Sequence, residues 1–376
     1  MIKKLFEPAS IKGMHLRNRF VRSATAEGMT TFDGHPTREL EELYCKLAEG
    51  EIGLIITCGA CIEAWQNYPH TLGFRSPFGI YEDRYIETWQ KITRAVHERG
   101  AKIAMQIGHL GRQDIAELRG SAPIAPSAIP INGSDVVPPR QMNVGDIKEI
   151  VEKFAQACRR VKEAGFDAVQ YHGAHGNLIN NFMSPFTNIR TDDYGGAVEN
   201  RARFMVDVID RTRQLIGTDY PLMIKMNFND FVDGGLEKDE ALNIADRITR
   251  AGIDCIEVSG GTLSESKDHI SVKGIHKKEQ ESYFQIYAKA LKEVVAIPVI
   301  LVGGHRTPNV MARIVEDGAA DFVSMSRPLI REPGLIKRWK NGNFEKAKCI
   351  SCNQCFDNWI LRPLRCYADE PYDEGQ

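Results

Sequence analysis

A helix-end signature recurs along this chain and limits its fold more than any other feature. In four places a glycine ends a predicted helix and lies three or four residues before an apolar run: Arg99-Gly100-Ala101-Lys102 before Ile103, Ala164-Gly165-Phe166-Asp167 before Ala168, Ala251-Gly252-Ile253-Asp254 before Cys255, and Asp317-Gly318-Ala319-Ala320-Asp321 before Phe322. Glycine suits the left-handed residue just past a helix, where it lets the chain turn back. The signature therefore predicts helices that lead directly into strands.

Short apolar runs of strand length alternate with these helices. We expect eight strands, at Arg19–Ala24, Leu54–Cys58, Ile103–Ile107, Ala168–Tyr171, Leu222–Met226, Cys255–Val258, Val299–Val302 and Phe322–Met325. After Asn143, a plausible N-cap, apolar residues follow at helical steps from Ile147 to Ala164. Eight strand–helix units favour an α/β fold of the (β/α)8 TIM-barrel type. No G-x-G-x-x-G follows a strand, so a Rossmann domain has no support.

Composition excludes several classes of partner. The 376 residues include 48 basic and 50 acidic side chains, so charge gives no reason to expect nucleic acid or an anionic membrane. The segment Met1–Pro8 lacks the apolar core of a signal peptide, and no run of about 18 apolar residues suggests a membrane span. Nine cysteines without a secretory signal favour a reducing compartment. We expect a soluble cytoplasmic protein.

Two histidines mark the candidate active site. His172 directly follows the predicted strand Ala168–Tyr171, and His175 follows three residues later. Side chains at the carboxyl ends of barrel strands point into the active site. Two imidazoles placed there could donate two hydrogen bonds to one substrate oxygen. For an isolated His-x-x-His, a metal pair or two structural histidines would be the better interpretation.

The run after these histidines resembles a known family. H-x-x-H-G, then S-P, then R-T-D-D-Y-G-G-x-x-E-N-R occur in order between His172 and Arg201. This order resembles the old yellow enzyme family of FMN-dependent NAD(P)H:flavin oxidoreductases, and the opening L-F-E-P is similar too. The resemblance covers about residues 1–335, which we assign to an FMN-binding barrel. Residues 336–376 form a separate cysteine-rich tail.

The resemblance implies a flavin site at the ends of several strands. The loop after the first strand would lie along the flavin ring, Gly59 would allow close approach of that ring, and an amide and a cation would meet its edge: Ser23, Ala24, Thr25, Ala26, Gly59, Gln106 and Lys225. A purely structural role for Gln106 is the alternative. A buried lysine without a charged partner is costly, which argues against such a role for Lys225.

A phosphate site is expected on independent grounds. The loops after the seventh and eighth strands of these barrels commonly bind phosphate through backbone N–H groups and an arginine. Gly303 and Gly304 follow the seventh predicted strand, and Ser326 and Arg327 follow the eighth.

The resemblance also implies the chemistry. NAD(P)H would reduce FMN, and a small-molecule electrophile such as an α,β-unsaturated carbonyl compound would then accept hydride while His172 and His175 bind its oxygen. Many relatives carry a proton-donating tyrosine two residues after the second histidine, but here that position is Asn177. An amide is a very poor acid, so the proton donor is left open.

The tail contains the other concentrated signal. Cys349, Cys352, Cys355 and Cys366 form C-x2-C-x2-C-x10-C, a spacing that suits a 4Fe-4S cluster better than zinc. It resembles the dienoyl-CoA reductase-like branch, in which such a cluster passes electrons between FMN and a further flavin domain. Reduced cysteines without metal are the alternative.

Three functions remain in competition. The first is an FMN-dependent NAD(P)H oxidoreductase, the second a flavin dehydrogenase or demethylase that passes electrons to an iron–sulfur cluster, and the third a non-catalytic flavoprotein subunit. The substrate, the choice between NADH and NADPH, and formation of a homo-oligomer are left open.

Overall fold

A closed parallel barrel forms the centre of the computed structural model, which describes residues 2–64, 78–131, 137–357 and 364–369. β3 pairs with both β4 and β13, and β4 pairs in turn with β6, so the sheet closes on itself. The barrel strands are β3 (Phe20–Arg22), β4 (Leu54–Ile56), β6 (Lys102–Gly108), β9 (Ala168–Gly173), β10 (Leu222–Asn227), β11 (Cys255–Ser259), β12 (Val299–Leu301) and β13 (Phe322–Met325). The predicted TIM barrel is confirmed.

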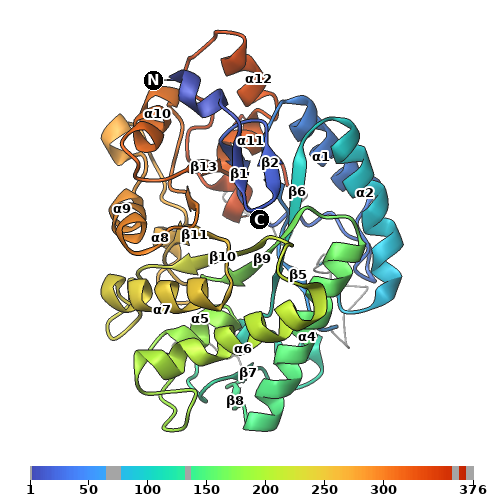
Figure 1. Cartoon of the computed structure of the whole chain (residues 1–376), viewed down its shortest axis with the longest axis vertical. Coiled ribbons are helices and arrows are strands. Elements are labelled where there is room, and N and C mark those ends of the chain that lie inside the picture. Colours follow the sequence, from blue (N-terminus) through green and yellow to red (C-terminus); the bar gives the residue numbers. More distant parts are fainter. Residues whose placement is uncertain (1, 65–77, 132–136, 358–363, 370–376) are drawn as a thin grey trace.

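Helices surround the strands on the outside (Figure 1). The main ones are α1 (Arg38–Glu49), α2 (Ile86–Glu98), α4 (Val144–Glu163), α6 (Val198–Ile216), α7 (Lys238–Ala251), α9 (Gln285–Val294) and α10 (Pro308–Glu316). Shorter elements lie in the loops: η1 (Ile2–Phe6), β5 (Ala60–Cys61), η2 (Asp83–Tyr85), η3 (Gly111–Gln113), α3 (Ala116–Arg119), β7 (Ile124–Ala125), β8 (Arg140–Gln141), α5 (Leu178–Met183), α8 (Lys267–Ile270) and η4 (Lys278–Gln280).

The local signals that predicted this alternation are present in the structure. The glycines of the four helix-end signatures have φ of 75° (Gly100), 81° (Gly165), 120° (Gly252) and 69° (Gly318), the left-handed region that glycine enters without steric cost. The Asn143 side chain accepts the Asp146 backbone N–H, and Asp146 returns the contact in a capping box at the start of α4.

A small hairpin closes the amino end of the barrel. β1 (Ala9–Ile11) pairs antiparallel with β2 (Met14–Leu16). The hairpin side chains Ile11, Met14 and Leu16 belong to the same buried cluster as strand residues inside the barrel, such as Val21 and Phe322. With this end filled by apolar side chains, polar chemistry is confined to the carboxyl end.

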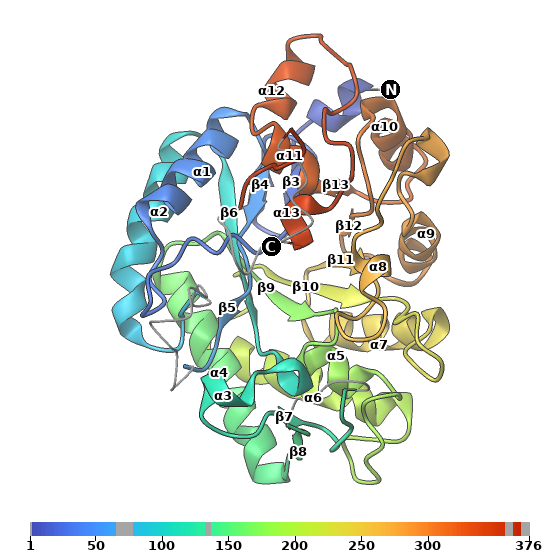
Figure 2. The same cartoon turned by 180° about the vertical axis from the view of Figure 1, so that it is seen from behind.

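The C-terminal segment lies at the side of the molecule that faces the viewer in Figure 2, whereas the hairpin faces the viewer in Figure 1. It contains α11 (Arg327–Arg331), α12 (Leu335–Lys340) and α13 (Gln354–Asp357). Trp339 of α12 is fully buried, and its ring centroid lies 5.8 Å from that of Phe20. The division into a barrel and a tail at residue 335 stays a prediction. In the described ranges, no helix has the length and apolar character needed to cross a bilayer.

Candidate flavin and substrate site

Strand register brings three charged or ionisable side chains together inside the carboxyl half of the barrel. Lys225 of β10 is opposite His172 of β9 on one side and Glu257 of β11 on the other. Lys225 is 4% exposed and Glu257 is 0% exposed. The Lys225 ammonium lies 3.0 Å from the Glu257 carboxylate. Lys225 therefore has a charged partner, the buried Glu257 carboxylate, which the sequence did not lead us to expect.

Glu257 is the centre of a buried polar network. Its Oε1 accepts hydrogen bonds from Ser23 Oγ at 2.7 Å and Ser324 Oγ at 2.8 Å. Lys225 Nζ also donates to Ser23 Oγ at 2.8 Å. Burial alone would raise the pKa of Glu257, but Lys225 and the hydrogen-bond donors outweigh it and hold the pKa below its ordinary value. We therefore treat Glu257 as an anion at neutral pH inside the barrel.

The same carboxylate fixes the orientation of two neighbouring amides. A carboxylate can only accept, so Gln170 directs its NH2 group to Glu257 Oε2, at 2.9 Å. Gln170 then offers its Oε1 to the NH2 group of Gln106, at 2.8 Å. This leaves the Oε1 of Gln106 directed toward Gly59, where an added Cβ would lie 3.4 Å from it. Gln106 consequently presents an acceptor at the position where the sequence predicts a flavin edge.

Both histidines of the motif are neutral. Burial, followed by the nearby Lys225 cation, lowers the pKa of His172 to about 3. Burial and the neighbouring His172 lower the pKa of His175 well below its usual range. The ring centroids are 5.3 Å apart and the rings are nearly perpendicular, at 89°. Each ring therefore carries one N–H at neutral pH.

Different partners hold the two rings. His175 Nε2 lies 2.7 Å from Ser259 Oγ, and its backbone has a φ of 61°, a strained conformation for a residue with a Cβ. His172 Nε2 lies 3.2 Å from the Asn177 side-chain nitrogen, while its Nδ1 is buried and has no hydrogen-bond partner among the described residues. The orphaned nitrogen marks a place where a ligand would contribute a hydrogen bond.

The predicted ring-side residues lie in the loop after β3. Ser23 follows β3 directly and donates a hydrogen bond to Glu257, while Ala24, Thr25 and Ala26 are partly exposed. Thr25 Oγ1 lies 2.7 Å from Ser326 Oγ, so the loop after β3 meets the loop after β13. Their roles toward a flavin stay predictions.

The predicted phosphate loops are also adjacent, and they involve the tail. Gly303 and Gly304 have φ of 143° and 72°. The positive φ of Gly304 favours glycine, and an added Cβ would also lie 2.3 Å from Ile275 Cδ1, which would have to move. Arg327 donates from Nη1 to the Val272 carbonyl at 2.9 Å and to Asn353 Oδ1. Asn353 lies between two of the tail cysteines, a contact that the spacing of the motifs did not predict.

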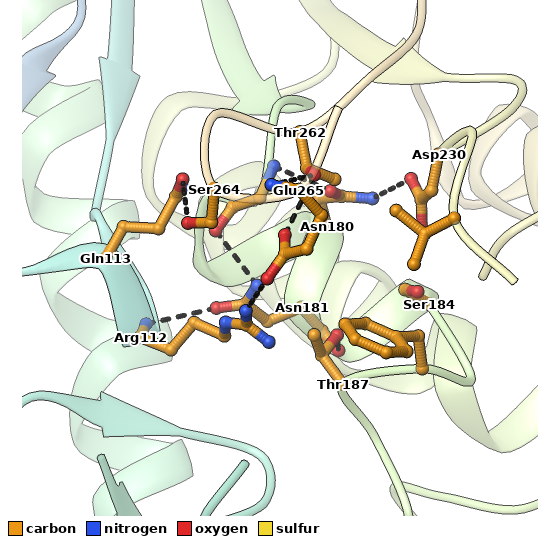
Figure 3. Close-up of a pocket in the computed structure, with 13 residues that line it drawn as sticks. Arg112, Gln113, Asn180, Asn181, Ser184, Thr187, Asp230, Thr262, Ser264 and Glu265 are labelled. Atoms are coloured by element: carbon orange, nitrogen blue, oxygen red, sulfur yellow. Dashed lines mark hydrogen bonds and ion pairs between the residues drawn. The ribbon is translucent and has the colours of Figure 1, made fainter. Parts of the chain in front are cut away.

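A small polar cavity lies beside the His175 turn (Figure 3). Arg112 and Gln113 line one side of it and Asp230 lines the opposite side. Arg112 is 2% exposed and ion-paired with Glu265. Gln113 donates to the His175 carbonyl at 3.0 Å, so this wall also supports the strained turn.

The four tail cysteines approach one another without forming a ligand set. Burial and the nearby Cys349 sulfur raise the pKa of Cys355 to about 12, and Cys352 and Cys366 add to the shift. The Ser351 N–H donates to Cys349 Sγ at 3.5 Å. In the part of the chain that the structure describes, no three His, Cys, Asp or Glu side chains are arranged to hold a metal ion.

Comparison with known proteins shows the family of this chain. A model of the NADH:flavin oxidoreductase / NADH oxidase family matches residues 4–345, and the chain belongs to this family. It is 37% identical to the NADH oxidase of Thermoanaerobacter brockii over 96% of this chain and 54% of that protein. It is 35% identical to the NADPH dehydrogenase of Bacillus subtilis (strain 168) over 89% of this chain and 93% of that protein.

Solved structures are similar to this chain over nearly its whole length. The 2-naphthoyl-CoA reductase in complex with 2-naphthoyl-CoA has a TM-score of 0.90 at 26% identity, covering 98% of this chain and 57% of that one. The old yellow enzyme homologue from Zymomonas mobilis has a TM-score of 0.77 at 26% identity, covering 98% and 100%. The predicted resemblance is confirmed. The chain spans about half the length of the NADH oxidase and of a metal reductase from Desulforamulus reducens, at 54% and 53%.

Sequence reasoning missed Glu257 and Gln170, which hold the site together. Each is a polar residue in the middle of an apolar strand, in C-I-E-V-S and A-V-Q-Y. That interruption was a readable signal, because a charged side chain in a buried strand requires a partner.

The Lys225–Glu257 pair generates a stability prediction. Glu257→Gln leaves the Lys225 cation buried without a counter-charge, and we expect it to lower the free energy of unfolding by about 3–5 kcal/mol. Urea unfolding followed by circular dichroism measures this loss. The double variant Glu257→Gln/Lys225→Met should recover most of it, because neither charge remains. If the loss in the double variant equals the sum of the losses in Glu257→Gln and Lys225→Met alone, the two residues are not coupled.

Proposed function

We propose that this protein binds FMN and uses NAD(P)H to reduce activated alkenes such as α,β-unsaturated carbonyl compounds. The observation that carries the proposal is the pair of neutral imidazoles, His172 and His175, held beside the buried Lys225 at the carboxyl end of β9 and β10. The names of its relatives, an NADH oxidase and an NADPH dehydrogenase, support the same class of reaction.

The residues present fit FMN. Gln106 offers an acceptor oxygen and Lys225 a cation to the polar edge of the ring, and Gly59 leaves room beside them. Gly303, Gly304, Ser326 and Arg327 would hold the single phosphate. When bound, the flavin would supply the hydride chemistry, and the protein supplies orientation and electrostatics.

His172 and His175 would bind the carbonyl oxygen of the substrate. Two preorganised N–H donors stabilise the negative charge that develops on that oxygen during reduction. Asn177 occupies the position of a proton donor in many relatives, but its amide does not release a proton at neutral pH. The proton for the α-carbon would come from water or another group.

A reducing compartment fits the same proposal. All nine cysteines are free thiols, including the fully buried Cys158 and Cys255. A cytoplasmic location, where thiols are kept reduced, is part of this proposal.

Cofactor identity gives the first test. We expect the flavin released from purified protein to have the mass of FMN. It should be reduced anaerobically by NADH or NADPH and reoxidised by cyclohexenone. FAD in place of FMN, or protein that takes up no flavin, would contradict the proposal.

The histidine pair gives a second test. His172→Ala and His175→Ala should each slow flavin reoxidation by cyclohexenone on the order of 100-fold, because each removes one preorganised donor. Reduction by NAD(P)H should change much less. Stopped-flow absorbance separates the two half-reactions. An unchanged oxidative rate in both variants would remove the pair from substrate binding.

A second candidate function is electron transfer from the flavin to an iron–sulfur cluster in the tail. The contact between Arg327 and Asn353 favours it, because it joins the proposed phosphate site to the loop that carries Cys352 and Cys355. The four thiols are a suitable donor set, and the Ser351 N–H already donates to a sulfur. Metal binding would have to draw the thiols into ligand geometry. A non-catalytic flavoprotein subunit is the remaining alternative, and absence of both activities would favour it.

The tail prediction separates metal binding from a simple cysteine-rich cap. In protein prepared anaerobically we expect iron and acid-labile sulfide in near-stoichiometric amounts, ahead of zinc. Cys352→Ser and Cys355→Ser should each release the metal and loosen the tail, whereas Cys45→Ser, on the outer helix α1, is the matched control. If elemental analysis finds neither iron nor zinc, the electron-transfer candidate fails.

A further inference from the structure

Asn177 is held rigidly at the start of a helix beside the histidine pair. It is the N-cap residue of α5, is 3% exposed, and its carbonyl accepts the Asn181 backbone N–H at 2.8 Å. Its side chain makes no capping hydrogen bond. The polar groups of this side chain are therefore available for hydrogen bonds other than helix capping.

The orientation of the Asn177 amide follows from its neighbours. Its Nδ2 lies 3.0 Å from the Ala174 carbonyl oxygen. A carbonyl oxygen can only accept, so the atom facing it must be the NH2 group rather than the amide oxygen. The same Nδ2 lies 3.2 Å from His172 Nε2. The amide thus directs a donor at that ring nitrogen.

A donor at Nε2 determines where the proton of His172 resides. Nε2 must supply a lone pair, since an N–H there would face another N–H. The ring is neutral, because burial and Lys225 disfavour its charged form. Its single proton is therefore on Nδ1, and Nδ1 is the buried atom that lacks a partner. A buried N–H without an acceptor is unfavourable until a ligand oxygen occupies the site.

We propose that Asn177 is a positioning residue that fixes the tautomer of His172, so that His172 presents its Nδ1 hydrogen to an oxygen of a bound ligand. The inference rests on the proposed function only for the identity of that ligand, which is either the flavin or the substrate. Asn177 thus acts by setting the position of the proton on His172, and it does not itself donate a proton to the substrate. The tautomer of His175 is not fixed in this way, because its Nε2 contacts the Ser259 hydroxyl, which can donate or accept a hydrogen bond.

The tautomer can be observed directly, without any assay of activity. In protein labelled with 15N at histidine, with the signals of His172 identified by their loss in His172→Gln, we expect a protonated Nδ1 and an unprotonated Nε2. Asn177→Leu, which removes the donor, should increase the fraction protonated at Nε2. His175 should keep its spectrum in that variant and serves as the internal control. A wild-type His172 protonated at Nε2 overturns the proposal, whatever the enzyme reduces.

A second variant guards against failure of Asn177→Leu to fold. Asn177→Asp has nearly the same shape, and aspartate suits a helix N-cap. Its carboxylate accepts instead of donating, so the proton of His172 should move to Nε2. Unchanged protonation of His172 in both folded variants overturns the proposal.

Binding measurements then identify the acceptor. The probe is 4-nitrophenolate, a flat molecule with an anionic oxygen whose absorbance reports its ionisation. We expect Asn177→Leu to weaken its binding to FMN-loaded protein about tenfold and to leave FMN affinity of the apoprotein unchanged. Loss confined to FMN affinity would assign the acceptor to the flavin and support the same role for Asn177. No loss in either measurement means that the Nδ1 hydrogen is not used, and the proposal fails.

Discussion

The buried ion pair between Lys225 and Glu257 is the interaction on which the rest of the site depends. Two charges inside a barrel are stable only if each is paired and hydrogen-bonded. Glu257 meets that condition with Lys225, Ser23 and Gln170. Because a carboxylate only accepts, it also sets the direction of every amide connected to it. Glu257 therefore holds the Lys225 cation beside the proposed flavin site. Through Gln170 it also determines that Gln106 presents its carbonyl oxygen, and not its NH2 group, to that site.

The fold was predictable because its signals are local and repeated. Glycines at Gly165 and Gly252 end helices in the left-handed conformation, and apolar runs of strand length follow each of them. Such signals depend only on neighbouring residues. The strand limits were less certain: β6 and β9 each extend beyond the predicted run, to Gly108 and Gly173. Those added residues are where the strands stop burying aliphatic side chains and begin to line the site.

For the candidate site, the sequence could propose residues but could not show how they are connected. The sequence identified His172, Lys225 and Gln106 by motif, but it could not show that strand register joins Lys225 to Glu257. Nor could it show which hydrogen-bonding group Gln106 or Asn177 presents. Those properties depend on partners that are distant along the chain, and an amide changes from donor to acceptor by a half-turn. The sequence shows which residue is present, but whether its amide donates or accepts at the site depends on the hydrogen-bond network around it.

Arg327 connects the two parts of the molecule that sequence analysis treated separately. Its Nη1 is directed to Val272 and Asn353, which are backbone and side-chain acceptors in the loop after β11 and in the cysteine segment. A guanidinium has five N–H donors in a fixed plane, so donors other than Nη1 could bind a phosphate oxygen. The same arginine can thus bind phosphate and tail at once. Asn353 adopts a φ of 65°, a left-handed conformation that asparagine enters more readily than most residues, and its contact with Arg327 helps to hold the tail there. Order in the cysteine segment and order at the proposed phosphate site are therefore linked through one side chain.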